Sequence, residues 1–435
     1  MNIFQKDKKI GFSHKTFTKN KKGYLLQENV FMRINTLGMV QDINLKTHGV
    51  LNDNFTLSSF DFKISSGRFN FSATGSVSGD MINLETRSSG ASRTFGIKIK
   101  KKPYIAAGIL DAIRATGLKA GEKYTFDVFD PTTMSQEPVM VSVLDIENIN
   151  IQGSMKAATK LLMNFKGTTQ FAWIGEDGEV LKEKGLLGIN LEKTSRKDAL
   201  YGLPLETGED LTKVASIASN VVIKDAAVLQ TLKLEIGGIK YSDVNLHGER
   251  QILTDNILTI DKESLSGLAP VLDVDNLETL ETIFMQPGPF IQSDHPKIKT
   301  QAKKIIQNEI VPFKKAKKLI NWVYNNIEKR PVLSVPDALS TLENRIGDCN
   351  EHAVLLAALA RASGIPTRIE TGLAYINGRF YYHAWNLLYL GKWITADSAF
   401  GQIPADVTRI RFTTGSLQQL DLMSIIGRIK LKVIE

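Results

Sequence analysis

The strongest candidate for a nucleophile in this sequence is Cys349. It is the only cysteine among 435 residues, so it cannot form a disulfide within the chain. An apolar run at residues 353–362, interrupted only by Arg361, follows it and is typical of a buried helix that stops at Gly364 and Pro366. We therefore predict that Cys349 lies in the first turn of this helix, where unpaired N–H groups and the helix dipole lower the pKa of a thiol and favour the thiolate.

A histidine and an aspartate further along the chain could activate this thiol. His383 lies in an aromatic stretch at residues 380–385 that favours a strand, and the turn signal Asn377-Gly378 predicts a hairpin with a partner strand at 367–375. Asp397 follows a second turn and a short strand, so we expect it beside His383 on an adjacent antiparallel strand. A thiolate nucleophile needs a base, and the base needs an orienting group. The candidate catalytic residues are therefore Cys349, His383 and Asp397.

Each of these residues also has a simpler interpretation. A lone cysteine is most often a small buried hydrophobic residue, and His383 could be a hydrogen-bonded strand histidine. His352 is an alternative base, but it lies three residues after Cys349 on the same predicted helix and so projects beside the thiol. A zinc site at Cys349 and His352 is less favoured, since the chain has no second cysteine and no closely spaced histidine pair. Asp348 is a candidate cap for the helix.

The order and spacing of these segments resemble the transglutaminase-like superfamily, a branch of the papain-like cysteine-enzyme fold. The matching pieces are Gly347-Asp348-Cys349, the helix ending in Gly364-Ile365-Pro366, His383-Ala384-Trp385 and the segment 393–397. The resemblance implies that Cys349, His383 and Asp397 form a triad and that the thiol forms a thioester with a carbonyl substrate. The sequence departs from the family pattern in two respects: Ser398 stands where proline is frequent, and Leu387 and Leu388 stand where many bacterial members have a glutamate.

These residues predict acyl transfer on an amide bond of a protein or peptide substrate. The backbone N–H of Cys349 would stabilise the oxyanion, and His383 would protonate the leaving amine. Hydrolysis by a peptidase or amidase is favoured over protein-glutamine cross-linking, because no calcium-binding loop of the kind found in calcium-regulated cross-linking enzymes is visible. We expect no cofactor and no metal. A binding or scaffold protein of the cell envelope that retains the fold without the chemistry is the alternative from a different class.

The chain predicts an α+β protein with three segments. Residues 1–205 form an antiparallel β-rich, half-barrel-like domain with a helix at 104–116, and residues 206–290 form a β-rich connecting module. Within this module we expect a helix at 210–220 and strands at 228–236 and 251–260. Gln286-Pro287-Gly288-Pro289 marks a boundary. Residues 291–435 form the transglutaminase-like, papain-like domain, and three helices at 297–309, 313–327 and 336–344 precede the candidate nucleophile.

The N-terminal segment is similar to the β-rich domains that precede transglutaminase-like domains in exported bacterial proteins, and to half-barrels of the lipoprotein-carrier type. Lys8-Lys9-Ile10-Gly11-Phe12 and residues 173–187 carry this similarity. It implies a lipid or cell-envelope partner, a periplasmic or envelope location, and an export signal upstream of Met1, because none is visible in the chain itself. The net charge of +8 comes from short, scattered lysine clusters, which are typical of solvated faces and not of a nucleic-acid site. No apolar run reaches the length of about 18 residues that a transmembrane segment needs.

Overall fold

The computed structural model describes residues 1–88, 91–165, 167–202, 205, 207–272, 282–414, 425 and 427–435. The chain divides into two compact units, which are described separately below. Unit 1 comprises residues 1–214 and 333–335, and unit 2 comprises residues 215–332 and 336–435. The division into segments 1–205, 206–290 and 291–435 stays a prediction, and residue 206, where the second segment begins, lies outside the described residues.

Unit 1 is built around one sheet of 15 strands in the order β8-β7-β6-β5-β4-β3-β2-β1-β15-β14-β13-β12-β11-β10-β9. Its first wall consists of β1 (Asn2–Gln5), β2 (Lys8–Asn20), β3 (Gly23–Thr36), β4 (Met39–Leu51), β5 (Leu57–Ser66), β6 (Phe69–Ser78), β7 (Met81–Ser88) and β8 (Ala91–Lys98). The second wall consists of β9 (Tyr104–Ile105), β10 (Lys123–Asp130), β11 (Ser135–Ile151), β12 (Ser154–Phe165), β13 (Thr168–Gly175), β14 (Val180–Lys184) and β15 (Ile189–Glu192). β1 pairs with both β2 and β15 and so joins the two walls.

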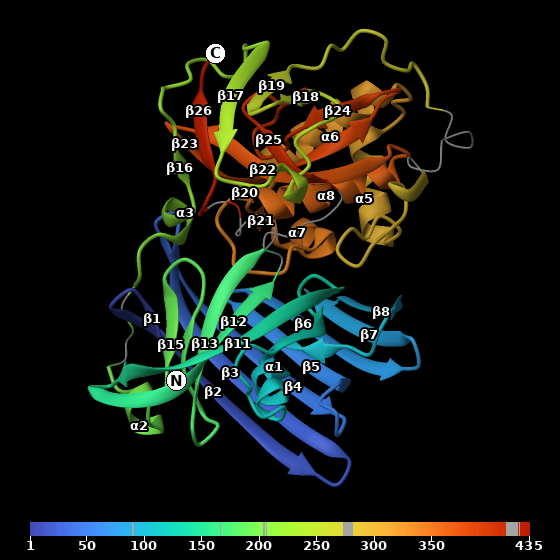
Figure 1. The fold of residues 1–435 in the computed structure, drawn as a ribbon. Helices are drawn as coiled ribbons and strands as arrows, with labels where there is room; N and C mark the ends of the chain where they lie inside the picture. Colours follow the sequence, from blue (N-terminus) through green and yellow to red (C-terminus); the bar gives the residue numbers. More distant parts are fainter. Residues whose placement is uncertain are drawn as a thin grey trace. The chain divides into compact units, whose positions relative to one another are not determined.

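The sheet curls around a short helix, α1 (Ile109–Arg114), as Figure 1 shows. The apolar side of α1 packs on β10 to β13 through Ile109, Ile113 and their neighbours. Its opposite side reaches the first wall, where the carboxylate of Asp111 pairs with Lys15 of β2 at 2.5 Å. The predicted helix at 104–116 was therefore too long, because residues 104–105 join the sheet as β9 and a 3-10 turn, η1 (Ala106–Gly108), precedes α1.

Two short helices follow the last strand of the large sheet in the sequence, before the first segment of unit 1 ends at Val214. They are α2 (Arg196–Leu200), which Ser195 caps, and α3 (Leu211–Val214). The predicted helix at 210–220 was also too long. It ends at Val214, and residues 217–218 instead form the edge strand β16 (Ile217–Ala218) of unit 2.

The described part of unit 2 contains two main sheets and four helices with defined bounds. The five-stranded sheet has the order β16-β23-β22-β25, with β24 also paired to β23. Its strands are β22 (Thr367–Ile376), β23 (Arg379–Tyr389), β24 (Trp393–Ala396) and β25 (Ile410–Thr414), in addition to β16. The four-stranded sheet has the order β18-β19-β17-β26, with β17 (Thr231–Gly237), β18 (Gln251–Thr254), β19 (Ile257–Asp261) and β26 (Lys430–Val433). The single strand predicted at 251–260 was wrong, because Asp255 takes a left-handed conformation and turns the chain between β18 and β19.

The helices of unit 2 are α5 (Pro296–Ile306), α6 (Pro312–Asn326), α7 (Ala338–Asn344) and α8 (Cys349–Ala362). Both α5 and α6 begin at a proline, which suits the first helical position because it has no N–H group to leave unpaired. Two further elements, η2 (Tyr241–Asp243) and a small parallel ladder of β20 (Glu328–Lys329) with β21 (Ile346–Gly347), complete the unit. None of the helices in the described part of the chain is long and apolar enough to cross a membrane.

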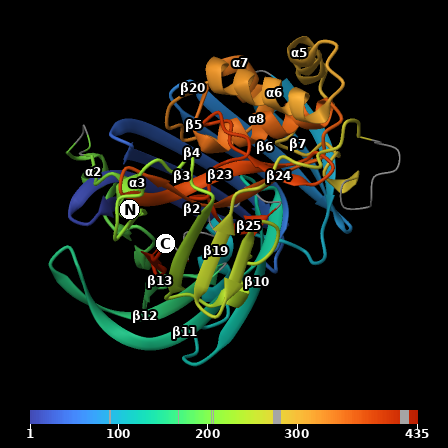
Figure 2. The same cartoon turned by 90° about the horizontal axis from the view of Figure 1, so that it is seen from above.

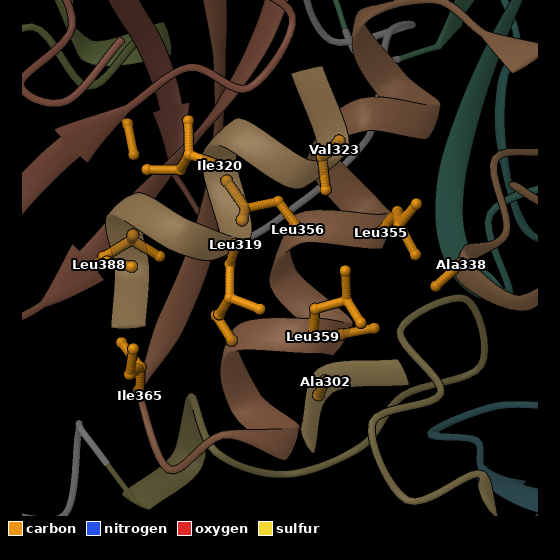
Figure 3. Close-up of a cluster of buried hydrophobic side chains, with 14 of the residues drawn as sticks. Ala302, Leu319, Ile320, Val323, Ala338, Leu355, Leu356, Leu359, Ile365 and Leu388 are labelled. Atoms are coloured by element: carbon orange, nitrogen blue, oxygen red, sulfur yellow. The ribbon is translucent and has the colours of Figure 1, made fainter. Parts of the chain in front are cut away.

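The helices and the four-stranded sheet lie on opposite sides of the five-stranded sheet (Figures 1 and 2). α8 is apolar on almost every side, as the run after Cys349 predicted, because other elements enclose it. Its residues Leu355, Leu356 and Leu359 meet Leu319 and Val323 of α6 in a cluster of buried hydrophobic side chains (Figure 3). This cluster fixes the helix whose first residue is the candidate nucleophile.

Candidate active site

The N-terminus of α8 holds Cys349 in a defined position. Asp348 is the N-cap, and its carboxylate accepts a hydrogen bond from the backbone N–H of Asn350 at 2.8 Å. Glu351 completes a capping box, because its carboxylate accepts from the backbone N–H of Asp348 at 3.0 Å. The prediction that Asp348 caps the helix is therefore confirmed. Cys349 is the first residue of the helix and is half-buried against Ala353 and Ala384.

Two side-chain hydrogen bonds tie this helix end to β23. The hydroxyl of Tyr382 donates to Oδ1 of Asn350 at 2.8 Å, and Nδ2 of Asn386 donates to the carbonyl of Ala353 at 2.9 Å. Asn350 and Asn386 are both buried, so neither bond competes with bulk water. These bonds set the position of Cys349 along the strand that carries His383.

The outer edge of β23 is open where the helix meets it. β16 pairs with residues 379–380 and β24 pairs with residues 386–389, so no described strand covers residues 381–385 on that edge. The sulfur of Cys349 lies beside the backbone N–H of Ala384, within this gap. The thiol therefore lies at the part of the β23 edge with which no described strand pairs, next to Ala384.

His383 and Asp397 meet directly, as we expected from the hairpin. Nε2 of His383 and Oδ2 of Asp397 are 2.8 Å apart, and both side chains are buried. Asp397 directly follows β24, which pairs with β23 in antiparallel register. A carboxylate can only accept, so the imidazole proton sits on Nε2 and leaves Nδ1 as the proton acceptor of the neutral ring. No hydrogen bond joins His383 to Cys349 in the described structure.

A buried arginine that the sequence analysis did not single out completes the environment of Asp397. Nε and Nη2 of Arg409 donate to Oδ2 of Asp397 at 3.0 and 2.9 Å, and Nη1 donates to Asp406. Arg409 is only 1% exposed. The signal that could have found it is a charged pair in an otherwise apolar stretch, where Ala405, Val407 and Ile410 are fully buried.

Two aromatic rings frame His383. Trp385 stacks on the imidazole with ring centres 6.0 Å apart, and its Nε1 donates to the buried carboxylate of Glu370 at 2.9 Å. Phe400 meets the imidazole edge-on at 5.4 Å and also covers the guanidinium of Arg409 at 4.5 Å. Phe400 is 39% exposed, so it separates the charged groups from solvent while presenting an apolar face outward.

The electrostatics of the thiol differ from the sequence-based expectation. Burial raises the pKa of the Cys349 thiol well above its usual range, and the carboxylates of Asp348, Glu351 and Asp397 act in the same direction. The backbone N–H of Ala384 opposes them by stabilising the charged sulfur. The predicted lowering of the thiol pKa by the helix N-terminus was wrong, because burial of the thiol and, after it, the charge of Asp348 disfavour the thiolate. A thiolate at this position requires a positive partner.

Asp397 shows the opposite balance. Burial would raise the pKa of its carboxyl, but the charges and hydrogen bonds of His383 and Arg409 outweigh burial and hold the pKa well below its usual range. Asp397 therefore stays ionised throughout the range in which an imidazole titrates, which is the state in which it stabilises an imidazolium.

His352, the alternative base, is turned back onto its own helix. Its Nδ1 lies 2.7 Å from the carbonyl of Asp348, so this nitrogen carries the proton and donates. Burial lowers the pKa of His352 and keeps the ring neutral. Within the described residues, no group of three or more histidine, cysteine, aspartate or glutamate side chains is placed to hold a metal ion.

Comparison with known proteins assigns the class of this domain. Residues 299–398 match the model of the transglutaminase-like superfamily, and this range runs from within α5 through α8, the hairpin of β22 and β23, and Asp397. The C-terminal part of the chain therefore contains a transglutaminase-like domain. No curated protein matches the sequence.

Three solved structures show distant likeness. A "Putative Cysteine Protease" from Cytophaga hutchinsonii is 20% identical, with 47% of this chain and 81% of that chain covered and a TM-score of 0.33. A beta-barrel-like protein of unknown function from Brucella abortus is 9% identical, with 41% and 84% covered and a TM-score of 0.32. A "putative protease" from Parabacteroides distasonis is 11% identical, with 76% and 64% covered and a TM-score of 0.22. Because all three scores are below 0.5, the functional proposal rests on the site itself.

Proposed function

We propose that unit 2 catalyses acyl transfer on amide bonds of a protein or peptide through a thioester on Cys349, and that water is the usual acceptor. The observation that carries this proposal is the 2.8 Å contact between His383 and Asp397, beside the edge gap of β23 that holds the thiol. Base, orienter and nucleophile thus come from three elements that one hydrophobic core holds together.

The resting site contains a neutral thiol, so the proton must move during attack. As the sulfur of Cys349 approaches a substrate carbonyl, Nδ1 of His383 takes its proton, and contact between the two side chains tightens in the substrate complex. Ionised Asp397 stabilises the resulting imidazolium. The backbone N–H of Cys349, one of the first-turn groups without a partner inside the helix, donates to the oxyanion.

Collapse of the tetrahedral intermediate breaks the C–N bond, and His383 returns its proton to the leaving amine. The thioester on Cys349 is then resolved when water attacks its carbonyl and the thiol is restored. A primary amine at the same step would give cross-linking. Hydrolysis stays the preferred outcome of the proposal, because the sequence shows no calcium-binding loop of the kind found in calcium-regulated cross-linking enzymes.

The test uses the fact that the chain has one cysteine. We would follow nitrophenolate release from p-nitrophenyl acetate together with the intact mass of the protein. Acylation should add one acetyl group at Cys349, and Cys349→Ala should abolish it. His383→Ala should slow the release by about 10²–10⁴-fold, because the neutral thiol loses its base.

The matched control is His247→Ala, which removes an exposed histidine from the same unit. It should acylate like the original protein. Acylation that persists in Cys349→Ala, or that is equally fast in His383→Ala and His247→Ala, would rule out the proposed chemistry. Addition of a primary amine such as glycine ethyl ester then separates the two acceptors, since cross-linking chemistry would yield the amide product in preference to acetate.

One observation favours a second candidate, a binding protein that retains the fold without catalysis. The pKa of the Cys349 thiol is raised by its surroundings, and no hydrogen bond joins the thiol to His383 in this structure. A non-catalytic protein should leave Cys349 inert to iodoacetamide at neutral pH in the folded state and reactive after unfolding. An enzyme should be alkylated while folded, and more slowly in His383→Ala than in His247→Ala.

The lipid partner implied for unit 1 also stays a proposal. A cavity of about 350 Å³ lies beside α1 and is lined mainly by apolar and aromatic residues, including Phe55, Tyr104, Tyr124 and Phe126. Its size falls in the range of small-molecule sites. Native mass spectrometry should show a bound apolar molecule that Phe126→Asp displaces, and repeated preparations without added mass would count against the idea.

A further inference from the structure

The oxygen of Asp397 that meets His383 is shared with an arginine. Oδ2 accepts from Nε2 of His383 at 2.8 Å and from Nε and Nη2 of Arg409 at 3.0 and 2.9 Å. A guanidinium is always charged, so by itself it would cancel the negative charge that Asp397 offers to an imidazolium. An arginine in this place needs a compensating charge if Asp397 is to assist His383.

Asp406 supplies that charge on the far side of the guanidinium. It contacts Nη1 of Arg409 and is itself held by Nε2 of Gln402 at 3.1 Å and by the hydroxyl and backbone N–H of Thr408. Burial would raise the pKa of Asp406, but Arg409 and Thr408 outweigh burial and lower it. Asp406 is 4% exposed and Asp397 is fully buried, so the three charges form one desolvated row.

The charge balance of this row depends on the protonation of His383. Asp397, Arg409 and Asp406 together carry one net negative charge, and the imidazolium form of His383 brings the sum to zero. In a low-dielectric site a neutral sum is strongly favoured. Two hydrogen bonds from Arg409 thus hold Asp397 in place, and the row of Asp397, Arg409 and Asp406 keeps one net negative charge that can stabilise the imidazolium of His383.

We infer that Arg409 and Asp406 are positioning residues that act through Asp397 to set how strongly His383 holds a proton. Asp406 neutralises Arg409, and Arg409 fixes the orientation of Asp397. The inference goes beyond the proposed acyl transfer, because it concerns the proton affinity of His383 whether or not the thiol reacts. If the proposed function holds, the row determines how well His383 stabilises the charge that it acquires from Cys349.

Other ionisable groups on the elements around His383 lie outside this row. On β23 itself they are Arg379, Tyr381, Tyr382 and Tyr389; on β22 they are Arg368, Glu370 and Tyr375; on β25 it is Arg411; at the start of α8 they are Asp348, Cys349, Glu351 and His352. Glu370 pairs with Arg411 at 3.4 Å and with Arg368 at 3.8 Å. Glu249 also pairs with both arginines, so this second group contains two acids and two arginines and adds no net charge beside the Asp397 row.

The test is a titration of the histidine ring signals by NMR, with His383 assigned from the signal that is lost in His383→Ala. Asp406→Asn keeps the shape of the side chain and removes one negative charge. The proton affinity of His383 should therefore fall by about tenfold, and the pH midpoint of its titration should fall accordingly. Arg409→Met removes the positive charge and should move the midpoint in the opposite direction by a similar factor. The four histidines other than His383 and His352 serve as internal references.

A merely structural role predicts a different pattern. Loss of support would misorient Asp397 in both variants, and the His383 midpoint would fall in both, which would overturn the inference. Should Arg409→Met fail to fold, Asp406→Glu replaces it, since this variant keeps the charge and disturbs the geometry. The inference expects a midpoint close to that of the original protein for Asp406→Glu and a lowered one for Asp406→Asn; equal lowering in both would overturn it.

The acylation assay separates this inference from the proposed function. If His383 titrates as expected in the variants while Cys349 never acylates, the row sets the proton affinity of a non-catalytic histidine. If Cys349 acylates in a His383-dependent way but neither variant moves the titration, the acyl transfer stands and the role of the row is wrong.

Discussion

Both units bury carboxylates beside a basic group, but they do so with opposite consequences. In unit 2, Asp397 receives two bonds from Arg409 and one from His383, and its pKa is held low despite complete burial. In unit 1, Glu28 and Glu183 lie near a single lysine, Lys15, which already pairs with Asp111 at 2.5 Å. Burial there raises the pKa of Glu28, and it raises that of Glu183 to about 6.

The comparison shows that burial alone does not decide whether a carboxylate is charged. What decides it is the number of fixed donors that reach the oxygen atoms. A planar guanidinium places several N–H groups at set angles, whereas one ammonium shared among three acids cannot satisfy them all. Asp397 of unit 2 is thereby prepared to hold a cation, whereas Glu28 and Glu183 of unit 1 bind protons more readily than exposed glutamates.

The largest expected effect comes from removing the charge of Asp397. Asp397→Asn keeps the size of the side chain but cannot stabilise an imidazolium, so acylation by p-nitrophenyl acetate should slow by about 10²–10⁴-fold. Glu183→Gln, the matched change in unit 1, should leave the rate unchanged. A rate in Asp397→Asn within a few-fold of the original would show that His383 works without its carboxylate.

The next largest effect should come from removing the cation of each cluster, which should lower the stability of the two units by different amounts. Arg409→Met leaves two buried carboxylates without their shared cation and should destabilise unit 2 by about 3–5 kcal/mol. Lys15→Met should cost unit 1 less than about 2 kcal/mol, because acids whose pKa is already raised can neutralise themselves by binding protons.

Tryptophan fluorescence can report on the units separately during urea unfolding. Trp173 is the only tryptophan of unit 1, and the other three belong to unit 2. Arg409→Met would therefore be measured in a Trp173→Phe background, and Lys15→Met through Trp173 itself. Equal losses in the two units would contradict the distinction between them.

The smallest effect is a pH dependence that belongs to unit 1. The raised pKa of Glu183 means that the folded state binds a proton more tightly than the unfolded state, so this contribution to stability is present below the ordinary value of 4.5 and is lost as pH rises through about 6. The loss amounts to about 2 kcal/mol. Glu183→Gln should remove it and stabilise unit 1 at pH 8.

The control for this prediction is Glu176→Gln, which changes an exposed glutamate in a turn of the same unit. The stability of Glu176→Gln should follow the original pH profile. If the profile of Glu183→Gln is also unchanged between pH 4 and 8, Glu183 does not titrate in that range and the contrast with Asp397 fails.

Much of the site could be predicted from the sequence because its signals are local. The apolar run after Cys349 could only be a buried helix, and Gly364 with Pro366 had to end it. The Asn377-Gly378 turn fixed the register of β22 and β23, which placed His383 on the strand beside Asp397. Hydrophobic periodicity and turn chemistry act within a few residues, so both can be recognised in the sequence without knowledge of the fold.

Element lengths were less predictable where neighbours compete for the same residues. The helical pattern around α1 lost its first residues to a sheet edge, and residues 217–218 were taken by β23 as an edge partner. In both places, local helix propensity is worth less than the backbone bonds that an adjacent strand offers.

What the sequence by itself determined is the order of a thiol, an imidazole and a carboxylate on a helix and two strands. What only the tertiary structure decided is their electrical state. The raised pKa of Cys349 and the lowered pKa of Asp397 depend on which charges stand beside them after folding. Arg409 and Asp406 come from the stretch before β25, and their effect on Asp397 arises through space in a desolvated core, where a contact of about 3 Å outweighs any preference encoded along the chain.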